Sequence, residues 1–237
     1  MSNSSFRNSN GTAPQAGIDI EPDKPSQMLK RIELQDILLE GNSGCGLEIE
    51  FGSYIGSTED VSIVAKNVWS GNNSIGLSVL SNVRLRGSID VSNLTVDGTH
   101  RGLGAGINMV DQSVDGAMVN IRDSLVRGVS SVGSGGPAPV MLGRHSPPKP
   151  SRALEFGQLA LINVTAWIGD ECQPFLLANL SRGCSGSSGT GRCGPIELYS
   201  LTGSFTVLAP VGCGCPYLVE ASGHPKHWDV SVRCINA

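Results

Sequence analysis

Four carboxylates with the same two-residue spacing stand near the start of the chain. Asp19 and Glu21 alternate with isoleucines in QAGIDIEP (15–22), and Glu48 and Glu50 repeat the arrangement 29 residues later in CGLEIEF. Such alternation is typical of a β-strand whose apolar residues face one side and whose acids face the other. If the two segments lie side by side, the four acids form one outward-facing patch.

Carboxylates that close together repel one another unless a cation, a bound proton or a basic group intervenes. Calcium suits such a patch because it takes about six to eight oxygen ligands. The spacing therefore predicts a calcium site formed by Asp19, Glu21, Glu48 and Glu50. Hydrolysis would instead need two carboxylates at a defined separation, which Asp19 with Glu48, or Glu48 with Glu50, would supply. An acidic edge that keeps a sheet soluble is the third interpretation.

An internal repeat indicates that the two acidic segments are neighbours. One column reads apolar-x-apolar-x-Asn/Asp, with variation at the end, and its members are IELQD (32–36), IVAKN (63–67), IDVSN (89–93), VNIRD (119–123), LALIN (159–163) and IELYS (196–200). The second column places alternating apolar residues after a Gly or Pro: GIDI from 17, GLEI from 46, GLSV from 76, GINM from 106, PVML from 139, PFLL from 174 and PYLV from 216. A period of about 30 residues with period-2 patterning predicts a β-solenoid. Stacked strands would then lie about 4.8 Å apart.

The polar end of the first column predicts a corner. Asn and Asp tolerate left-handed backbone and bond turn amides, so stacked copies are expected to form an inward hydrogen-bonded ladder. The residues of this ladder are Asp36, Asn67, Asn93, Asp123 and Asn163.

These corners, together with the G-I-x-I-like starts at residues 17, 46, 76 and 106, resemble the right-handed parallel β-helix proteins of the pectate-lyase-like superfamily. The resemblance implies an all-β fold, a single right-handed parallel β-helix (β-solenoid) of about seven coils over 17–237. Residues 1–16 are expected to be a polar leader or the remnant of a preceding coil, and an N-terminal cap is expected to be lacking, as in a fragment of a longer β-helix. The resemblance also implies that the Gly-led strand is the face that binds polysaccharide, with calcium held by acids.

In the next two coils the position equivalent to Asp19 and Glu48 is polar, at Ser78 and Asn108, and we call these residues the polar track. In the later coils the same position is apolar, at Met141 and Leu176. These two polar residues are predicted to contact substrate. Elimination or epimerisation of a uronate needs a base and neutralisation of the developing enolate. Basic residues on the neighbouring turns are predicted to do this chemistry: His100 and Arg101 as catalytic residues, and Arg84, Arg86 and His145 as substrate contacts. Arg84 and Arg86 alternate with apolar residues, so the solvated side of a strand is the competing interpretation.

Composition narrows the function classes. The 237 residues carry a net charge of −4, and residues 1–60 alone carry ten acids against four bases. Without a basic stripe, nucleic acid is excluded as the main partner, and no apolar run is long enough for a membrane span. Six of the seven cysteines fall in the last third, which is typical of disulfides in an exported protein. They make a Cys-rich part from about residue 172: Cys172, Cys184, Cys193, Cys213, Cys215 and Cys234.

The sequence thus favours an extracellular or cell-surface protein that binds carbohydrate, with an acidic glycan as the favoured partner and calcium as the expected cofactor. As an enzyme it would be a polysaccharide lyase or epimerase acting on uronate polymers. A non-catalytic structural or adhesion module and a glycoside hydrolase remain the alternatives.

Overall fold

The computed structural model describes residues 1–12, 15–54, 56–82, 84–99, 105–110, 116–129, 138–143, 154–155, 159–167, 176–179, 196–197, 201–208, 217–224 and 227–234. Side chains are described within the first six of these ranges and at Val140 and Val164.

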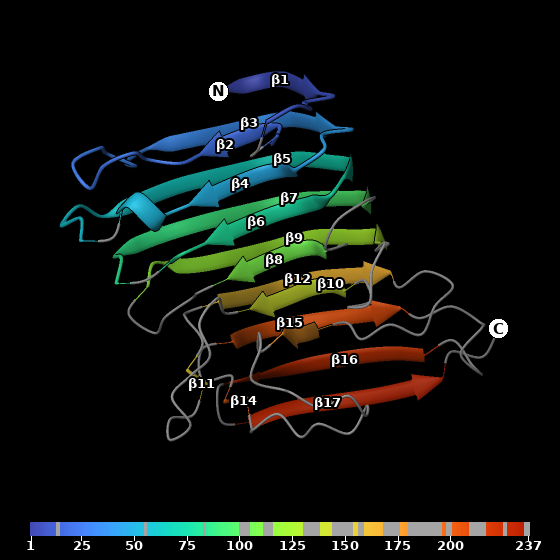
Figure 1. The fold of residues 1–237 in the computed structure, drawn as a ribbon. Helices are drawn as coiled ribbons and strands as arrows, with labels where there is room; N and C mark the ends of the chain where they lie inside the picture. Colours follow the sequence, from blue (N-terminus) through green and yellow to red (C-terminus); the bar gives the residue numbers. More distant parts are fainter. Residues whose placement is uncertain are drawn as a thin grey trace, which may run out of the picture.

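The described chain is almost entirely β-structure, arranged in two long layers (Figure 1). The nine-stranded sheet has the order β1 (Ser2–Arg7), β3 (Ile32–Glu40), β5 (Val61–Asn73), β7 (Gly87–Thr99), β9 (Met118–Val129), β12 (Leu159–Trp167), β15 (Leu201–Leu208), β16 (Tyr217–His224) and β17 (His227–Cys234). The six-stranded sheet has the order β13 (Leu176–Asn179), β10 (Ala138–Gly143), β8 (Ala105–Val110), β6 (Ile75–Leu80), β4 (Cys45–Glu50) and β2 (Ile18–Ile20). The remaining elements are the pair β11 (Leu154–Glu155) and β14 (Ile196–Glu197) and the 3₁₀ turn η1 (Gly52–Tyr54).

The chain alternates between the two sheets, and each strand from β1 to β15 pairs in parallel with its equivalent one turn away. This arrangement is a parallel β-solenoid, which confirms the predicted fold class. About four turns of it are clear among the described residues, and the expectation of about seven coils stays a prediction.

Alternating apolar residues fill the space between the sheets. In the six-stranded sheet, Leu47 lies beside Leu77, and the buried column continues through Ile107 and Val140. The nine-stranded sheet contributes matching buried columns, one of which is Leu34, Ala65, Val91 and Ile121. Each fully buried aliphatic side chain stabilises the fold by about 1.5–3 kcal/mol, so the columns are what hold successive turns in register.

The glycine in second position of β4 and of β6 is required by close approach of the next turn. A Cβ on Gly46 would lie 2.8 Å from the carbonyl oxygen of Gly76, and a Cβ on Gly76 would lie 2.5 Å from that of Gly106. Those separations are shorter than real Cβ contacts, so any larger residue would push successive turns apart.

The Asn/Asp corner has the predicted backbone but the opposite orientation. Asp36, Asn67, Asn93 and Asp123 have φ of 54°, 53°, 52° and 51°, which is the left-handed region. Asn67 Nδ2 donates to Asp36 Oδ1 at 2.7 Å, and Asn93 Nδ2 donates to Asn67 Oδ1 at 2.9 Å. The side chains lie on the outside of the bend, and Asn67, Asn93 and Asp123 are exposed, so the expectation of an inward ladder is wrong. The physical reason is that the bend leaves two consecutive residues on its convex side, as at Lys66 and Asn67, while Ala65 and Val68 on either side face the core. The side chain of the fifth expected member, Asn163 in β12, lies outside the described residues.

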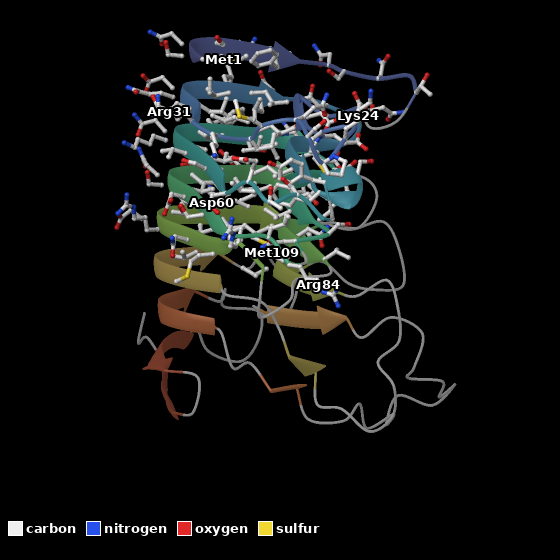
Figure 2. The ribbon with its side chains drawn as sticks, turned by 90° about the vertical axis from the view of Figure 1, so that its left-hand side faces the viewer. Met1, Lys24, Arg31, Asp60, Arg84 and Met109 are labelled. Atoms are coloured by element: carbon white, nitrogen blue, oxygen red, sulfur yellow. The ribbon has the colours of Figure 1, made fainter. Side chains whose placement is uncertain are left out.

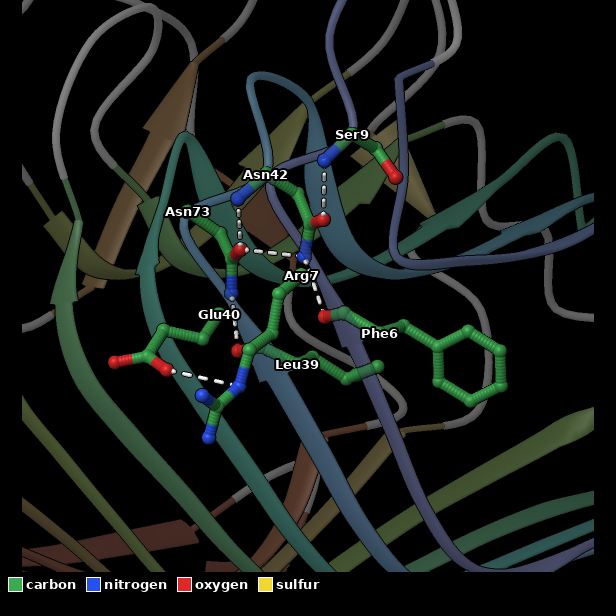
Figure 3. Close-up of polar contacts among 7 residues, drawn as sticks. All are labelled: Phe6, Arg7, Ser9, Leu39, Glu40, Asn42 and Asn73. Carbon is green, nitrogen blue, oxygen red and sulfur yellow. Dashed lines mark hydrogen bonds and ion pairs between the residues drawn. The ribbon is translucent and has the colours of Figure 1, made fainter.

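The inward polar ladder lies one bend later (Figure 3). There Gly41 and Asn72 take positive φ, and the next residues, Asn42 and Asn73, are fully buried. Asn73 Oδ1 accepts from the backbone N–H of Asn42 at 2.8 Å and from Asn42 Nδ2 at 2.9 Å. Asn42 Oδ1 in turn accepts from the backbone N–H of Ser9 at 3.0 Å. These carboxamides satisfy backbone groups that a sharp turn leaves without ladder partners.

Of the two alternatives for residues 1–16, the structure has Ser2–Arg7 as a strand of the solenoid. It pairs in parallel with β3, with Ser4 beside Ile37 and Arg7 beside Glu40. Asn3 and Asn8 have positive φ and take the two bend positions of that turn.

The C-terminal strands differ from the expected repeat. The residues Tyr217 to Val219 of PYLV lie in β16, which pairs antiparallel with β15 in the nine-stranded sheet rather than extending the other sheet. Ile196 and Glu197 of IELYS form the short β14, whereas Leu201–Leu208 pairs with β12. In β13 the register is shifted by one residue, because Leu177 rather than Leu176 lies beside Met141. Length changes in the intervening loops make a period read from sequence unreliable in this part of the chain.

Candidate acidic site on the six-stranded sheet

The structure brings the predicted acids of β2 and β4 together. Asp19 pairs with Glu48 between Ile18–Leu47 and Ile20–Ile49, so the 29-residue spacing corresponds to one turn of the solenoid. We call Asp19, Glu21, Glu48 and Glu50 the acidic patch. Glu21 follows β2 directly and Glu50 ends β4.

Burial, and after it the crowding of like charges, changes how Glu48 and Asp19 titrate. The pKa of Glu48 is raised from 4.5 to about 7, first because the carboxyl is partly buried and next because Asp19, Glu50 and Glu21 are close. The pKa of Asp19 is also raised, by burial and then by Glu21 and Glu50. Near neutral pH Glu48 is therefore shared between its protonated and ionised forms, and a carboxyl in that state both donates and accepts hydrogen bonds.

No basic side chain in the described ranges neutralises the patch. The ion pairs found there join Arg7 to Glu40, Lys30 to Glu59, Arg86 to Asp60 and Arg127 to Asp97. Within the patch, Glu50 Oε1 accepts from the backbone N–H of Gly52 at 2.7 Å. Among the described residues, the patch is therefore a concentration of negative charge in which protonation of Glu48 and Asp19 relieves the repulsion.

The polar track beyond the acids is present, but it is not open to solvent as predicted. Glu48 lies beside Ser78, and Ser78 lies beside Asn108 in the next turn. Asp19 is exposed and Glu48 is half-buried, whereas Ser78 and Asn108 are 1% and 2% exposed. A polymer on the surface would reach Asp19 and Glu48 without touching Ser78 or Asn108. The prediction that these two residues contact a surface-bound substrate is therefore wrong.

Asn108, the last residue of the polar track, has a side-chain oxygen without a hydrogen-bond donor. Its Nδ2 donates to Ser78 Oγ at 3.2 Å, but its Oδ1 has no hydrogen-bond partner within the described part of the chain. A buried carbonyl oxygen without a donor costs roughly 1–3 kcal/mol. Such an atom requires an explanation.

Cys45, the first residue of β4, lies next to the polar track. Its thiol lies near Glu48 and Ser78, and burial together with the charge of Glu48 raises its pKa well above the usual range. It packs with Ile75 and Ala105 in a small apolar cluster separate from the main core. A thiol kept protonated in this way is a poor nucleophile, so Cys45 serves as a polar neighbour of Glu48. The sequence did not indicate this role, because Cys45 alternates in step with the core residues Leu47 and Ile49 and was expected to face the same way.

Calcium does not fit the acidic patch as its side chains stand. Within the ranges whose side chains are described, no group of three or more His, Cys, Asp or Glu residues is arranged to hold a metal ion. The donor chemistry suits calcium, but the four carboxylates line two strands instead of converging on one point.

Two of the predicted basic residues, Arg84 and Arg86, lie in described ranges, in the turn between β6 and β7. Arg86 pairs with Asp60 at 3.1 Å and donates to the carbonyl oxygen of Thr58, so it fastens the turn between β6 and β7. Arg84 is exposed in the same turn, with φ of 56°, on the side of the molecule where Lys24 also lies (Figure 2). Neither arginine lies in a strand, so the interpretation as the solvated side of a strand is wrong. His100, Arg101 and His145 lie outside the described residues.

The disulfide prediction falls almost wholly outside the described residues. This holds for Cys172, Cys184, Cys193, Cys213 and Cys215, and Cys234 is placed only as the last residue of β17. Cys45 is a free, buried thiol.

Comparison with known proteins leaves this chain without an assigned relative. No family model matches it, and neither the curated proteins nor the solved structures contain a significant match. In the part of the chain that the structure describes, no helix is long and apolar enough to cross a membrane. The solenoid and the acidic patch are therefore the basis for inferring function.

Proposed function

We propose that this protein is a carbohydrate-binding β-solenoid, and that the polymer lies across the outer face of β2 and β4. The observation that carries the proposal is the in-register pairing of Asp19 with Glu48 on an open sheet face. Carboxyl groups accept hydrogen bonds from neighbouring sugar hydroxyls, and a half-protonated Glu48 also donates one. Rigid strands about 4.8 Å apart suit an extended ligand with repeated hydroxyls.

The resemblance to pectate-lyase-like proteins supports the carbohydrate class, but the patch supports binding better than elimination. A uronate polymer would bring more negative charge to four acids that already repel one another. The arrangement of these side chains does not suit the calcium ion that would bridge them. The lyase or epimerase activity, with His100 and Arg101 as its catalytic residues, stays a prediction.

A glycoside hydrolase is the second candidate, favoured by the raised pKa of Glu48. Such enzymes pair a carboxylic acid of raised pKa with a second carboxyl group. Glu48 would be the acid, and Glu50, two residues along β4, the second carboxyl group. A non-catalytic structural or adhesion module is the remaining candidate, since burial of Ser78 and Asn108 shortens the open polar face.

A panel of soluble glycans tests these candidates together. The chain is titrated with neutral, uronate and amino-sugar oligomers, with calcium or with a chelator, and products are followed by absorbance of unsaturated sugars and by new reducing ends. We expect binding that weakens in Glu48→Gln and persists in Glu33→Gln, an exposed acid on β3 in the other sheet. Unsaturated product would indicate a lyase and reducing ends a hydrolase, whereas no binding to any glycan would favour the structural module.

A further inference from the structure

One tryptophan lies on the outer face of the nine-stranded sheet. Trp69 in β5 stands between Val68 and Ser70, which are both buried, so alternation turns its indole ring away from the core. Its neighbours on the adjacent turns are Leu38 and Thr95. The side chains of Leu38, Trp69 and Thr95 are all partly exposed, so this part of the sheet face is open to solvent.

The ring occupies a space that the sequence leaves free at Gly71, the next residue on the same face. A Cβ on Gly71 would lie 2.0 Å from Cη2 of Trp69, 2.4 Å from Cζ3 and 2.6 Å from Cζ2, so a larger residue would displace the ring. Cζ2 and Cζ3 are on opposite sides of the ring and almost equally distant, which shows that the ring lies across the glycine and does not stand on its edge. Gly71 beneath it is buried. The indole therefore turns one face to the sheet and the other toward a ligand.

Two ion pairs flank the ring. Gly71 lies between Glu40 and Asp97 in the sheet, whose backbones are two strand spacings, or about 9.6 Å, apart. Glu40 pairs with Arg7 (Figure 3), and Asp97 pairs with Arg127. A carboxylate accepts about four hydrogen bonds and a guanidinium has five N–H donors, so one ion pair leaves both partners able to bind a ligand. The four charges cancel, and the row offers acceptors and donors together.

This combination fits a sugar ring better than it fits a cation or a protein. A pyranose whose hydroxyls are all equatorial has two faces of C–H groups and a rim of hydroxyls. The slightly positive C–H groups pack on the negative face of an indole, and the hydroxyls both donate and accept. A cation would meet carboxylates that arginines already neutralise. A protein interface needs about 800 Å² from each partner, whereas one aromatic ring supplies about 150–250 Å².

We propose that the surface formed by Trp69, Glu40 and Asp97 is a second glycan subsite. A neutral, β-linked glucose unit stacks on the indole, and its rim hydroxyls donate to the two carboxylates. No covalent bond forms or breaks. The subsite lies on the outer face of the other sheet from Asp19 and Glu48, so it is independent of the acidic patch. A solenoid with both sites holds one glycan on each sheet.

Titration calorimetry of the full chain with cellohexaose, a β-linked glucose hexamer, tests the subsite. We expect saturable binding that Trp69→Ala weakens at least about tenfold. Trp69→Phe should weaken it less, because a smaller ring still stacks. Val64→Ala is the matched control, since Val64 is a partly exposed apolar residue on the same face of β5, and it should leave the affinity unchanged.

Gly71→Ala tests the position of the ring without removing it. The new Cβ displaces the indole, so binding should weaken although Trp69 is still present. This variant and Trp69→Phe keep the test valid should Trp69→Ala fail to fold. Glu48→Gln should bind cellohexaose as tightly as the wild type at this subsite, which separates it from the function proposed for the acidic patch.

No binding of cellohexaose, or binding that Trp69→Ala and Gly71→Ala leave unchanged, would overturn the subsite without touching glycan binding that depends on Glu48. Competition by tetramethylammonium, which stacks on aromatic rings as a cation, would assign the surface to a cationic ligand and overturn the proposal. Self-association in analytical ultracentrifugation that Trp69→Ala abolishes would assign the surface to a second copy of the chain and overturn it as well.

Discussion

Asn42 and Asn73 are 31 residues apart, yet one oxygen joins them. Asn73 Oδ1 accepts both the backbone N–H and the side-chain Nδ2 of Asn42, while its own Nδ2 donates to the carbonyl oxygen of Leu39 at 3.0 Å (Figure 3). Both side chains are fully buried. The pair shows how the solenoid closes its sharpest bend without leaving backbone groups unpaired.

Replacing Asn73 with Ala should therefore destabilise the protein by about 2–4 kcal/mol, because several buried donors and acceptors lose their partners at once. Denaturant unfolding would measure the change. The neighbouring Asn72 is exposed with φ of 52°, so Asn72→Gly provides a control that should cost less than about 0.5 kcal/mol. Equal losses for the two variants would contradict the role of the buried pair.

The outer bend makes a separate prediction at Asn67. Asn67→Ala replaces a residue that tolerates φ of 53° by one that does not, which costs about 1–2 kcal/mol, and removes the bonds to Asp36 and Asn93. Asn67→Gly also removes those bonds but keeps the backbone relaxed. Thermal melts should place Asn67→Gly between the wild type and Asn67→Ala. An alanine variant as stable as the wild type would show that the bend does not depend on a left-handed residue.

Features repeated with a constant period were predictable from sequence. Alternation placed Leu47, Leu77 and Ile107 in one core column, and the 29-residue spacing placed Asp19 beside Glu48. Left-handed backbone at Asn67 followed from its residue type. These features depend on the backbone preference of each residue and on the register between turns, and both can be read from residue type and repeat spacing.

The direction of the side chains at the bends and the burial of the polar track were not predictable, because they depend on how the turns pack in space. The side chain of Asn67 points out of the bend and that of Asn73 points in, although both are asparagines near corners. The signal for the inner bend was a Gly or Asn followed directly by Asn, at 41–42 and again at 72–73. Burial of Ser78 and Asn108 has no local signal, since any residue on the face of a sheet has the same alternation whether or not something covers it.

The stability of the protein should fall as pH rises through the range set by Glu48. Its folded pKa of about 7 exceeds the ordinary 4.5, so between these values the folded state binds more protons than the unfolded state. The proton therefore stabilises the fold fully below about pH 4.5, and this contribution is lost as pH rises to 7. Because Glu48 is partly solvated, the effect amounts to about 1–2 kcal/mol after screening.

Glu48→Gln should remove this slope and make the variant more stable than the wild type above pH 7. Urea unfolding at pH 5, 6, 7 and 8 would measure it, with Glu33→Gln as the control that retains the slope. A wild-type stability that rises from pH 5 to pH 7 in parallel with the variant would contradict the raised pKa.

Cys45 should resist modification in the folded protein. Its thiol is buried and its pKa is raised by burial and by Glu48, so little thiolate is available to react. Maleimide labelling followed by peptide mass spectrometry should find Cys45 unmodified in buffer and fully modified in denaturant. Rapid native labelling of Cys45 would show that the start of β4 is open to solvent.

The most direct test of the account is the titration of Glu48 itself, followed by the NMR shift of its side-chain carboxyl carbon. The account predicts a pKa of about 7 in the wild-type protein, a lower value in Asp19→Asn, and no change in Glu33→Gln. A Glu48 that titrates near 4.5 and does not respond to Asp19→Asn would contradict the claim that successive turns bring these carboxyl groups into one patch.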